Sequence, residues 1–166
     1  VARFSEHAEA QHLLHSRQSA YRANHSTETA VLVVDDAIVR SIDSRNICAL
    51  ALLDLSSAFD TVDHDTLLSV LSRRFGVDGL ALEWFGSYLA GRTQTFQYNA
   101  QKSGPHAVTC SVPQGSVLGT QEFIAYTEEL EEVIEQHLLS LQMYADDTQL
   151  IQHTSMADIG TTIHRL

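Results

Sequence analysis

Apolar residues recur at helical spacing in the first third of the chain. Residues 3–15 carry an imperfect apolar stripe and predict a short helix. A second helix is predicted to begin at Ser26 or Thr27, whose hydroxyl can cap its first turn, and Glu28 stands near its positive end. Residues 47–53 then form an unbroken apolar run, which is typical of a strand covered on both faces.

Helical and strand patterns continue to alternate after this run. The further predicted elements are a helix from Asp63 or Asp65 to Gly76, a helix over 79–90, a hairpin of strands 93–99 and 106–112 around a turn at 102–105, a helix over 116–136, and a hairpin of strands 138–144 and 148–153. Asp146 and Asp147 stand at the tip of the last hairpin. No linker interrupts the pattern, so the sequence predicts one α+β domain.

Composition places the chain among globular intracellular proteins. It has 166 residues, of which 44% are hydrophobic and 19% charged, which is ordinary for a domain with a buried core. No apolar run approaches the roughly 20 residues of a membrane span, and the N-terminus lacks a secretory signal. We therefore expect a cytoplasmic or nuclear protein that is not secreted and has no membrane partner. Cys48 and Cys110 fall in predicted strands and are interpreted as buried thiols, with a single bridge left open.

The charge balance disfavours broad attraction to nucleic acid. Ten Lys and Arg residues face 21 Asp and Glu residues, giving a formal net charge of -11. Nine of the ten basic residues are Arg, however, and the guanidinium group is suited to bidentate phosphate contacts.

Three carboxylates form the main candidate site. Asp54 ends the apolar strand, and Asp146 and Asp147 occupy the hairpin tip, so the three can meet at one edge of a sheet. Adjacent carboxylates repel each other, and divalent cations offset that repulsion. Hard oxygen ligands favour Mg²⁺, with Mn²⁺ as an alternative, and two such ions about 3.5–4 Å apart assist phosphoryl displacement. A polar turn between strands is the alternative interpretation of the Asp pair.

Four segments, in order, resemble one protein family. Residues 53–60 (LDLSSAFD), 112–119 (VPQGSVLG) and 144–147 (YADD) look like the three palm motifs of reverse transcriptases from non-LTR retrotransposons of the LINE and jockey-like types. Residues 18–22 (QSAYR), with Ser26 and Thr27, resemble the preceding finger segment. The likeness covers nearly the whole chain.

This resemblance implies the palm of a right-hand polymerase, an antiparallel sheet backed by helices. Residues 1–46 would be finger-side helices, 47–154 the palm with motifs A, B and C, and 155–166 the start of a following helix. The chain begins with Val rather than Met, and we expect an incomplete domain with partial fingers and no thumb.

The resemblance also assigns residues to an RNA-directed DNA polymerase reaction. Its implied partners are an RNA template, a DNA primer and deoxynucleoside triphosphates, and protein partners are left open. The implied assignments are catalysis and binding of two Mg²⁺ ions by Asp54, Asp146 and Asp147, nucleotide binding by Leu55, Phe59, Gln114 and Gly115, and a template or phosphate contact by Arg22. Phe59 would exclude ribonucleotides at the sugar. The alternatives are a core aromatic for Phe59, an ordinary turn at Gln114, and a surface ion pair for Arg22.

Some positions depart from the family pattern. Thr120, Gln121 and Glu122 follow Gly119 where the family has Pro and apolar residues, which places a charge on a helix face that can meet the core. His15 shares a helical face with another histidine and is interpreted as solvated. Two other hypotheses follow: an inactive, truncated retrotransposon relic with at most a binding role, and an RNA-dependent RNA polymerase, which the ring of Phe59 disfavours.

Overall fold

The chain divides into two units, which are described separately. The structure is a computed structural model that describes residues 2–165. Unit 1 comprises Val1–Leu13 and Ser57–Tyr126, and unit 2 comprises Leu14–Ser56 and Thr127–Leu166. The ranges expected from the sequence also include Val1 and Leu166, which lie outside the described residues. The chain contains both helices and antiparallel sheet, as the sequence predicts.

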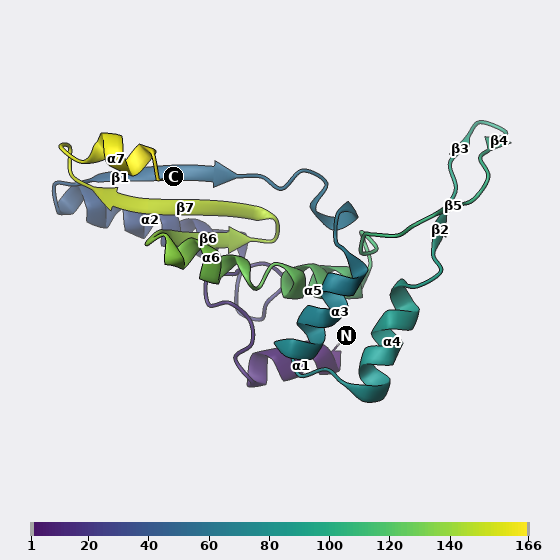
Figure 1. Cartoon of the computed structure of the whole chain (residues 1–166). Coiled ribbons are helices and arrows are strands. Elements are labelled where there is room, and N and C mark those ends of the chain that lie inside the picture. The colour runs from purple at the N-terminus through teal and green to yellow at the C-terminus, as the bar shows by residue number, and fades with distance from the viewer. Residues whose placement is uncertain (1, 166) are drawn as a thin grey trace. The chain divides into compact units, whose positions relative to one another are not determined.

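Unit 2 is built on a three-stranded antiparallel sheet (Figure 1). Its elements are α2 (Thr27–Asp43), β1 (Ile47–Leu53), α6 (Leu130–Gln136), β6 (Ser140–Tyr144), β7 (Asp147–Thr154) and α7 (Ile159–Ile163). The strand order is β1-β7-β6, so the long strand β7 is central. In the register, Ile151 of β7 faces Leu50 of β1 and Ser140 of β6.

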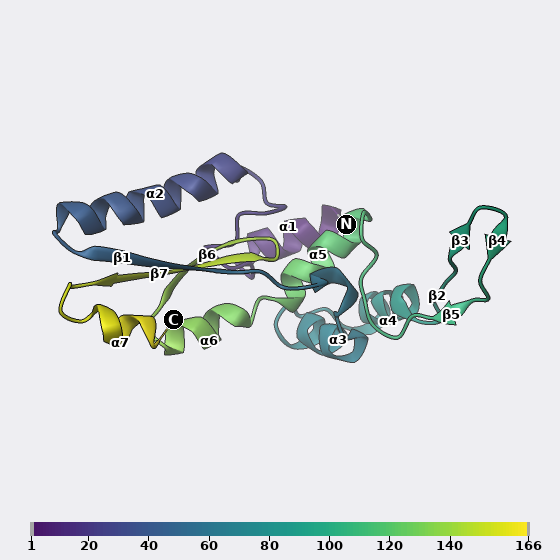
Figure 2. The ribbon, with the colours of Figure 1, turned by 90° about the horizontal axis from the view of Figure 1, so that it is seen from above.

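Helices cover both faces of this sheet, with α2 on one side and α6 and α7 on the other (Figure 2). Because side chains alternate between the faces of a strand, Leu141 and Met143 of β6 point to the same side as Leu150 of β7. They form a buried apolar cluster with Ile134 and Leu139. This cluster is the apolar core beneath α6.

The predicted start of α2 is confirmed. Ser26 is its N-cap: the Ser26 Oγ accepts a hydrogen bond from the Thr29 amide at 3.2 Å, and the Thr29 Oγ1 accepts one from the Ser26 amide at 2.9 Å. This reciprocal pair satisfies two amides that the first helical turn leaves without intrahelical partners.

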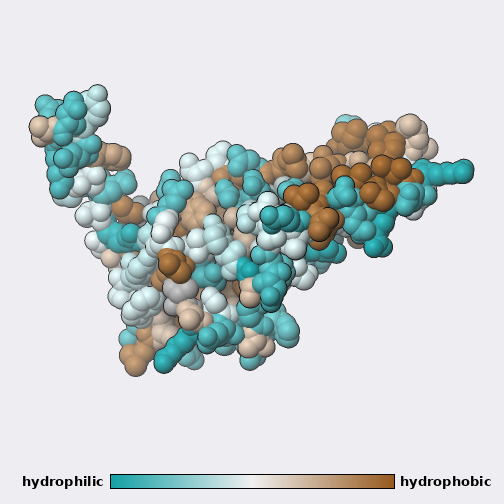
Figure 3. All heavy atoms as spheres, turned by 180° about the vertical axis from the view of Figure 1, so that it is seen from behind, coloured by the Kyte–Doolittle hydropathy of each residue, from teal (hydrophilic) through white to brown (hydrophobic). Residues whose placement is uncertain are grey.

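The expectation that residues 47–53 are covered on both faces is wrong. β1 is an edge strand, and the side chains of Leu52 and Leu53 are 72% and 43% exposed. An apolar run shows that a strand is favoured but does not show where in the sheet the strand lies. Apolar side chains of β1 and α2 gather on the face seen in Figure 3, and they include Val31, Leu32, Val39, Ile42, Leu50 and Leu52.

Unit 1 is mainly helical. Its elements are α1 (Ala2–Ala10), the 3-10 helix η1 (Ala58–Asp60), α3 (His64–Arg73), α4 (Gly79–Leu89), α5 (Val117–Tyr126) and four short strands. The ring of Phe4 contacts those of Phe75 and Phe85, with centroids 5.4 and 5.8 Å apart, and this contact joins α1 to the other helices. The first helix ends at Ala10, earlier than residue 15, and His12 beyond it takes a left-handed φ of 53°.

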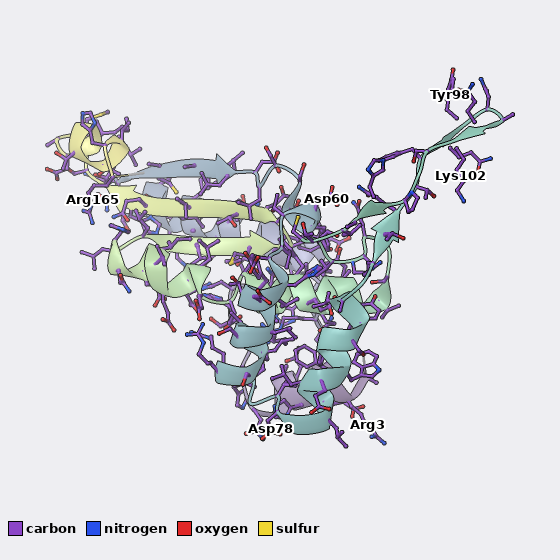
Figure 4. The ribbon with its side chains drawn as sticks, turned by 45° about the vertical axis from the view of Figure 1, so that its right-hand side comes forward. Arg3, Asp60, Asp78, Tyr98, Lys102 and Arg165 are labelled. Atoms are coloured by element: carbon purple, nitrogen blue, oxygen red, sulfur yellow. The ribbon has the colours of Figure 1, made fainter. Side chains whose placement is uncertain are left out.

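The hairpin predicted around 102–105 turns elsewhere. β2 (Thr93–Gln94) pairs with β5 (His106–Ala107), while β3 (Gln97–Tyr98) pairs with β4 (Gln101–Lys102). The turn therefore lies at residues 99–100, where Asn99 has a φ of 53°, a conformation that Asn tolerates well. Tyr98 and Lys102 extend from the tip of this ribbon (Figure 4).

Two further expectations need correction. The helix predicted over 116–136 is divided into α5 and α6 by a turn at residues 127–129, where the Leu130 amide donates to the Thr127 carbonyl at 3.0 Å.

Cys48 is half-buried, and burial raises the pKa of its thiol, whereas Cys110 is exposed rather than buried. Both are free thiols. Within residues 2–165, no helix combines the length and apolar character needed to cross a membrane.

Candidate active site

The three predicted catalytic carboxylates belong to the same end of the unit 2 sheet. Leu53, the last residue of β1, pairs with Thr148 of β7. Asp54 follows Leu53 and Asp147 precedes Thr148, so continuing the antiparallel register by one residue sets Asp54 opposite Asp147. Asp146 is the neighbour of Asp147 in the turn. The backbone thus places Asp54 at the same end of the sheet as Asp146 and Asp147, which are 92 and 93 positions away in the sequence.

The turn that carries the Asp pair is tight. β6 ends at Tyr144, which pairs with Asp147, and only Ala145 and Asp146 lie between the strands. The favoured two-residue hairpin turns, types I′ and II′, have a positive φ at their first central position, and Ala145 has a φ of 56°. Ala145 is buried, Asp146 is half-buried and Asp147 is exposed.

This end of the sheet suits a divalent cation by the chemistry of its donors. Carboxylate oxygens are ligands that Mg²⁺ prefers, and the backbone register places three residues with such side chains at one end of the sheet. Across residues 2–165, however, the side chains of Asp, Glu, His and Cys form no group of three close enough to hold a metal ion. Asp54 and Asp147 are exposed, so their side chains can turn toward a cation without breaking buried contacts.

Phe59, the predicted sugar gate, lies on η1 in unit 1. Its ring stacks on that of Phe123, with centroids 4.5 Å apart and planes inclined by 20°. It is half-buried, and its carbonyl accepts a hydrogen bond from the Val112 amide at 2.9 Å. The aromatic contact that we weighed as the alternative is therefore present, and it leaves part of the ring accessible.

Gln114 and Gly115 lie in the turn that leads into α5. Both are exposed, and Gly115 has a φ of 80°, a left-handed conformation that favours glycine. The bond from the Val112 amide to the Phe59 carbonyl fixes the start of this segment to η1. Leu55, the fourth predicted nucleotide contact, is 40% exposed in unit 2.

Gly119 has a structural role that our sequence analysis missed. A Cβ atom at this position would lie 2.5 Å from the Pro113 carbonyl oxygen and 2.8 Å from the Ser116 Oγ. The Gly119 amide donates to that Ser116 Oγ at 2.9 Å, which caps the start of α5. Gly119 therefore allows the preceding turn to fold closely against the helix. A glycine inside a helical pattern was the signal that could have revealed it.

The prediction that an ionisable side chain on this helix meets the core is confirmed at Glu122. Its side chain is fully buried, and neither carboxyl oxygen has a hydrogen-bond partner among the described residues. Burial raises its pKa to about 7, although the positive charge of Arg92 acts in the opposite direction. A carboxyl group at this position is favoured in its protonated form.

Arg22 binds the chain's own backbone. Its Nη1 donates to the carbonyl oxygens of His15 at 2.6 Å and Gln18 at 3.2 Å. Neither of our interpretations of Arg22, a phosphate contact or a surface ion pair, anticipated this role. The predicted contact with template or phosphate stays a prediction.

His15 is buried, so the expectation of a solvated histidine is wrong. Its Nδ1 accepts a hydrogen bond from the Arg17 amide at 2.6 Å, so the ring proton belongs on Nε2, which faces the Glu131 carboxylate. Burial, with Arg17 and Arg22 nearby, lowers the pKa of His15 to about 4. The ring is therefore neutral near pH 7, and its Nε2 lies in contact with the Glu131 carboxylate without a hydrogen-bond partner among the described residues.

Known proteins are similar to the chain over most of its length. The family model for reverse transcriptase (RNA-dependent DNA polymerase) matches residues 1–164. The probable RNA-directed DNA polymerases of two Drosophila melanogaster transposons are similar to the chain: that of transposon BS is 30% identical over 84% of the chain, and that of the X-element 33% identical over 74%. The RNA-directed DNA polymerase of the Drosophila mobile element jockey is 29% identical over 81%. The chain spans only 13–16% of the length of these relatives.

Proposed function

Since the chain belongs to the reverse transcriptase family, we propose that it supplies the palm of an RNA-directed DNA polymerase. The observation that carries this proposal is the register of β1 and β7, which sets Asp54 opposite Asp147 beside the Asp146 turn. In this proposal the β1-β7-β6 sheet is the palm sheet, residues 1–46 belong to the finger side, and residues 155–166 begin the next helix.

The proposed reaction is RNA-templated extension of a DNA primer. Asp54, Asp146 and Asp147 would hold divalent cations, Mg²⁺ or Mn²⁺. When bound, two such ions lower the cost of forming the attacking primer 3′-oxygen and stabilise the departing pyrophosphate. By holding these ions, the carboxylates would align the primer end with the triphosphate, and such alignment contributes much of the rate in phosphoryl transfer.

The remaining predicted residues would select the nucleotide. The amide of Leu55 is proposed to contact the triphosphate, and the half-buried ring of Phe59 to exclude a 2′-hydroxyl by its bulk. The exposed turn of Gln114 and Gly115 offers an amide side chain and close backbone approach to the new base pair. Arg22 is proposed to contact the template or a phosphate, and to do so its guanidinium group would have to give up its hydrogen bonds to the carbonyl oxygens of His15 and Gln18.

Primer extension tests this proposal directly. The chain is incubated with a DNA primer on an RNA template, deoxynucleoside triphosphates and Mg²⁺, and extension is expected to require the cation. Asp146→Asn removes one ligand charge with little change of volume and is expected to abolish extension. Asp158→Asn, at the start of α7, is the matched control and should leave extension intact. Extension that survives Asp146→Asn would contradict the assignment, whereas no extension by the unsubstituted chain would favour the second candidate function.

A second candidate function is nucleic-acid binding without catalysis, as in an inactive relic. The loss of catalysis is favoured by the lack of a three-residue chelating group within residues 2–165, whereas the formal net charge of -11 disfavours broad attraction to nucleic acid. This alternative predicts that the chain retains an RNA–DNA hybrid in a gel-shift assay but never extends the primer. An RNA polymerase would instead incorporate ribonucleotides at comparable efficiency, and the bulk of Phe59 predicts strong discrimination against them.

A further inference from the structure

The turn that carries Asp146 and Asp147 contains a backbone conformation that is costly for its residue type. Ala145 has a φ of 56°, in the left-handed region that L-residues with a side chain rarely occupy. Such conformations are unfavourable for residues with a side chain and persist only where neighbouring groups enforce them. The structure must therefore contain groups that hold Ala145 in place.

The side chain of Gln18 contacts both polar backbone atoms of Ala145. The Ala145 amide donates to the Gln18 Oε1 at 3.0 Å, and the Gln18 Nε2 donates to the Ala145 carbonyl at 3.3 Å. The same Oε1 accepts a hydrogen bond from the Ala20 amide at 2.9 Å. Gln18 is only 1% exposed, so water does not compete for these bonds.

The segment around Gln18 is itself fixed against β6, the edge strand that carries the turn. The Met143 amide donates to the Arg17 carbonyl and the Ser19 amide donates to the Met143 carbonyl, both at 2.9 Å. Gln18 and Met143 thus form a parallel bridge that extends the sheet beyond β6. The Gln142 Nε2 adds bonds to the Arg17 carbonyl at 2.9 Å and to the Ser19 Oγ at 2.8 Å.

From this network we propose that Gln18 is a positioning residue for the carboxylates of Asp146 and Asp147. It fixes the Ala145 turn through the backbone and thereby sets the direction in which the two acidic side chains leave the hairpin. The proposal rests on the proposed function, because the carboxylates matter only if they bind the cations of phosphoryl transfer. Gln18 itself touches neither the cations nor the substrates in this role.

Two substitutions at Gln18 separate its polar contacts from its volume. Gln18→Met keeps the length of the side chain and removes both polar atoms, whereas Gln18→Glu keeps the acceptor for the Ala145 and Ala20 amides. Gln152→Met, at the far end of β7, is the matched control in the same hairpin. Each is made in the whole chain and labelled for amide NMR spectroscopy.

Amide hydrogen exchange reports whether Gln18 holds the turn. In Gln18→Met, the Ala145 amide is expected to exchange about tenfold to a hundredfold faster, as for a buried donor that has lost its acceptor. It should stay within about twofold of the unsubstituted chain in Gln18→Glu and Gln152→Met. The Ile151 amide is the internal reference. If the Ile151 amide also loses protection in Gln18→Met, that substitution has loosened the whole sheet. The Gln18→Glu variant then tests the proposal, and fast exchange of the Ala145 amide in that variant overturns it.

Titration with Mn²⁺ alone reports whether the turn positions the carboxylates. Mn²⁺ is expected to broaden the Asp146 and Asp147 amide signals, with a midpoint at least about threefold higher in Gln18→Met than in the control. A freed turn with an unchanged Mn²⁺ midpoint overturns the positioning role alone. No broadening in the unsubstituted chain refutes the proposed function and, with it, a positioning role toward cations. Unchanged exchange of Ala145 in Gln18→Met overturns the claim that Gln18 holds the turn.

Discussion

Glu122 offers a test of the energetics of α5. Replacing it with Gln keeps the shape of the side chain and removes its ionisation. The carboxyl group is fully buried with no hydrogen-bond partner among the described residues, so deprotonation creates a charge without compensating donors. We expect Glu122→Gln to be more stable than the unsubstituted chain at alkaline pH and similar to it at acidic pH.

The magnitude follows from the pKa of Glu122. Burial raises that pKa from 4.5 to about 7. The folded state then binds the Glu122 proton more tightly than the unfolded state does. This proton binding stabilises the folded state fully below about pH 4.5, and the stabilisation is lost as the pH rises through about 7. With about 1.4 kcal/mol for each tenfold change in proton affinity, ionisation costs about 3 kcal/mol in total. About 2 kcal/mol of this is lost between about pH 5.5 and pH 8.5.

Urea unfolding at a series of pH values measures this effect. The observable is the difference in unfolding free energy between Glu122→Gln and the unsubstituted chain, which should grow by about 2 kcal/mol over that pH range. Glu83→Gln, on the exposed face of α4, is the control and should show no such growth. A difference that does not change with pH, or greater stability of the unsubstituted chain at alkaline pH, would show that Glu122 is ionised and stabilised by Arg92.

Three further substitutions test other parts of the structure. Gly119→Ala should lower the unfolding free energy by about 1–3 kcal/mol in urea, because its Cβ meets the Pro113 carbonyl; Gly86→Ala, with space for a Cβ, should not destabilise α4. Ser26→Ala should cost about 1 kcal/mol in the same assay by removing the cap of α2, and no loss would refute the capping box. His15 titrates with the opposite sign to Glu122: its pKa is lowered from 6.5 to about 4, so stability should fall as the pH drops through that range. His15→Gln should abolish this acid dependence, and a dependence that persists in urea titrations would assign it to other groups.

Local sequence signals identified much of the chain correctly. Ser26 caps α2 and Asp63 caps α3, where the Asp63 Oδ1 accepts a hydrogen bond from the Thr66 amide at 2.8 Å. The apolar run at 47–53 is a strand, and the Asp pair lies at a hairpin turn. These features depend on residues within about four positions of one another, so the sequence contains their physical cause.

The tertiary structure decided the features that depend on distant partners. The sequence did not show that β1 lies at an edge of the sheet, that Glu122 is buried without a hydrogen-bond partner among the described residues, or that Pro113 excludes a side chain at Gly119. It identified the segment around Gln18 only by resemblance, although this side chain bonds to Ala145, 127 positions away. The sequence by itself determined the type and approximate place of most helices and strands, and which residue types could perform the chemistry. Burial and contacts between distant residues arise only when strands pair and helices pack, and no local pattern records those energies.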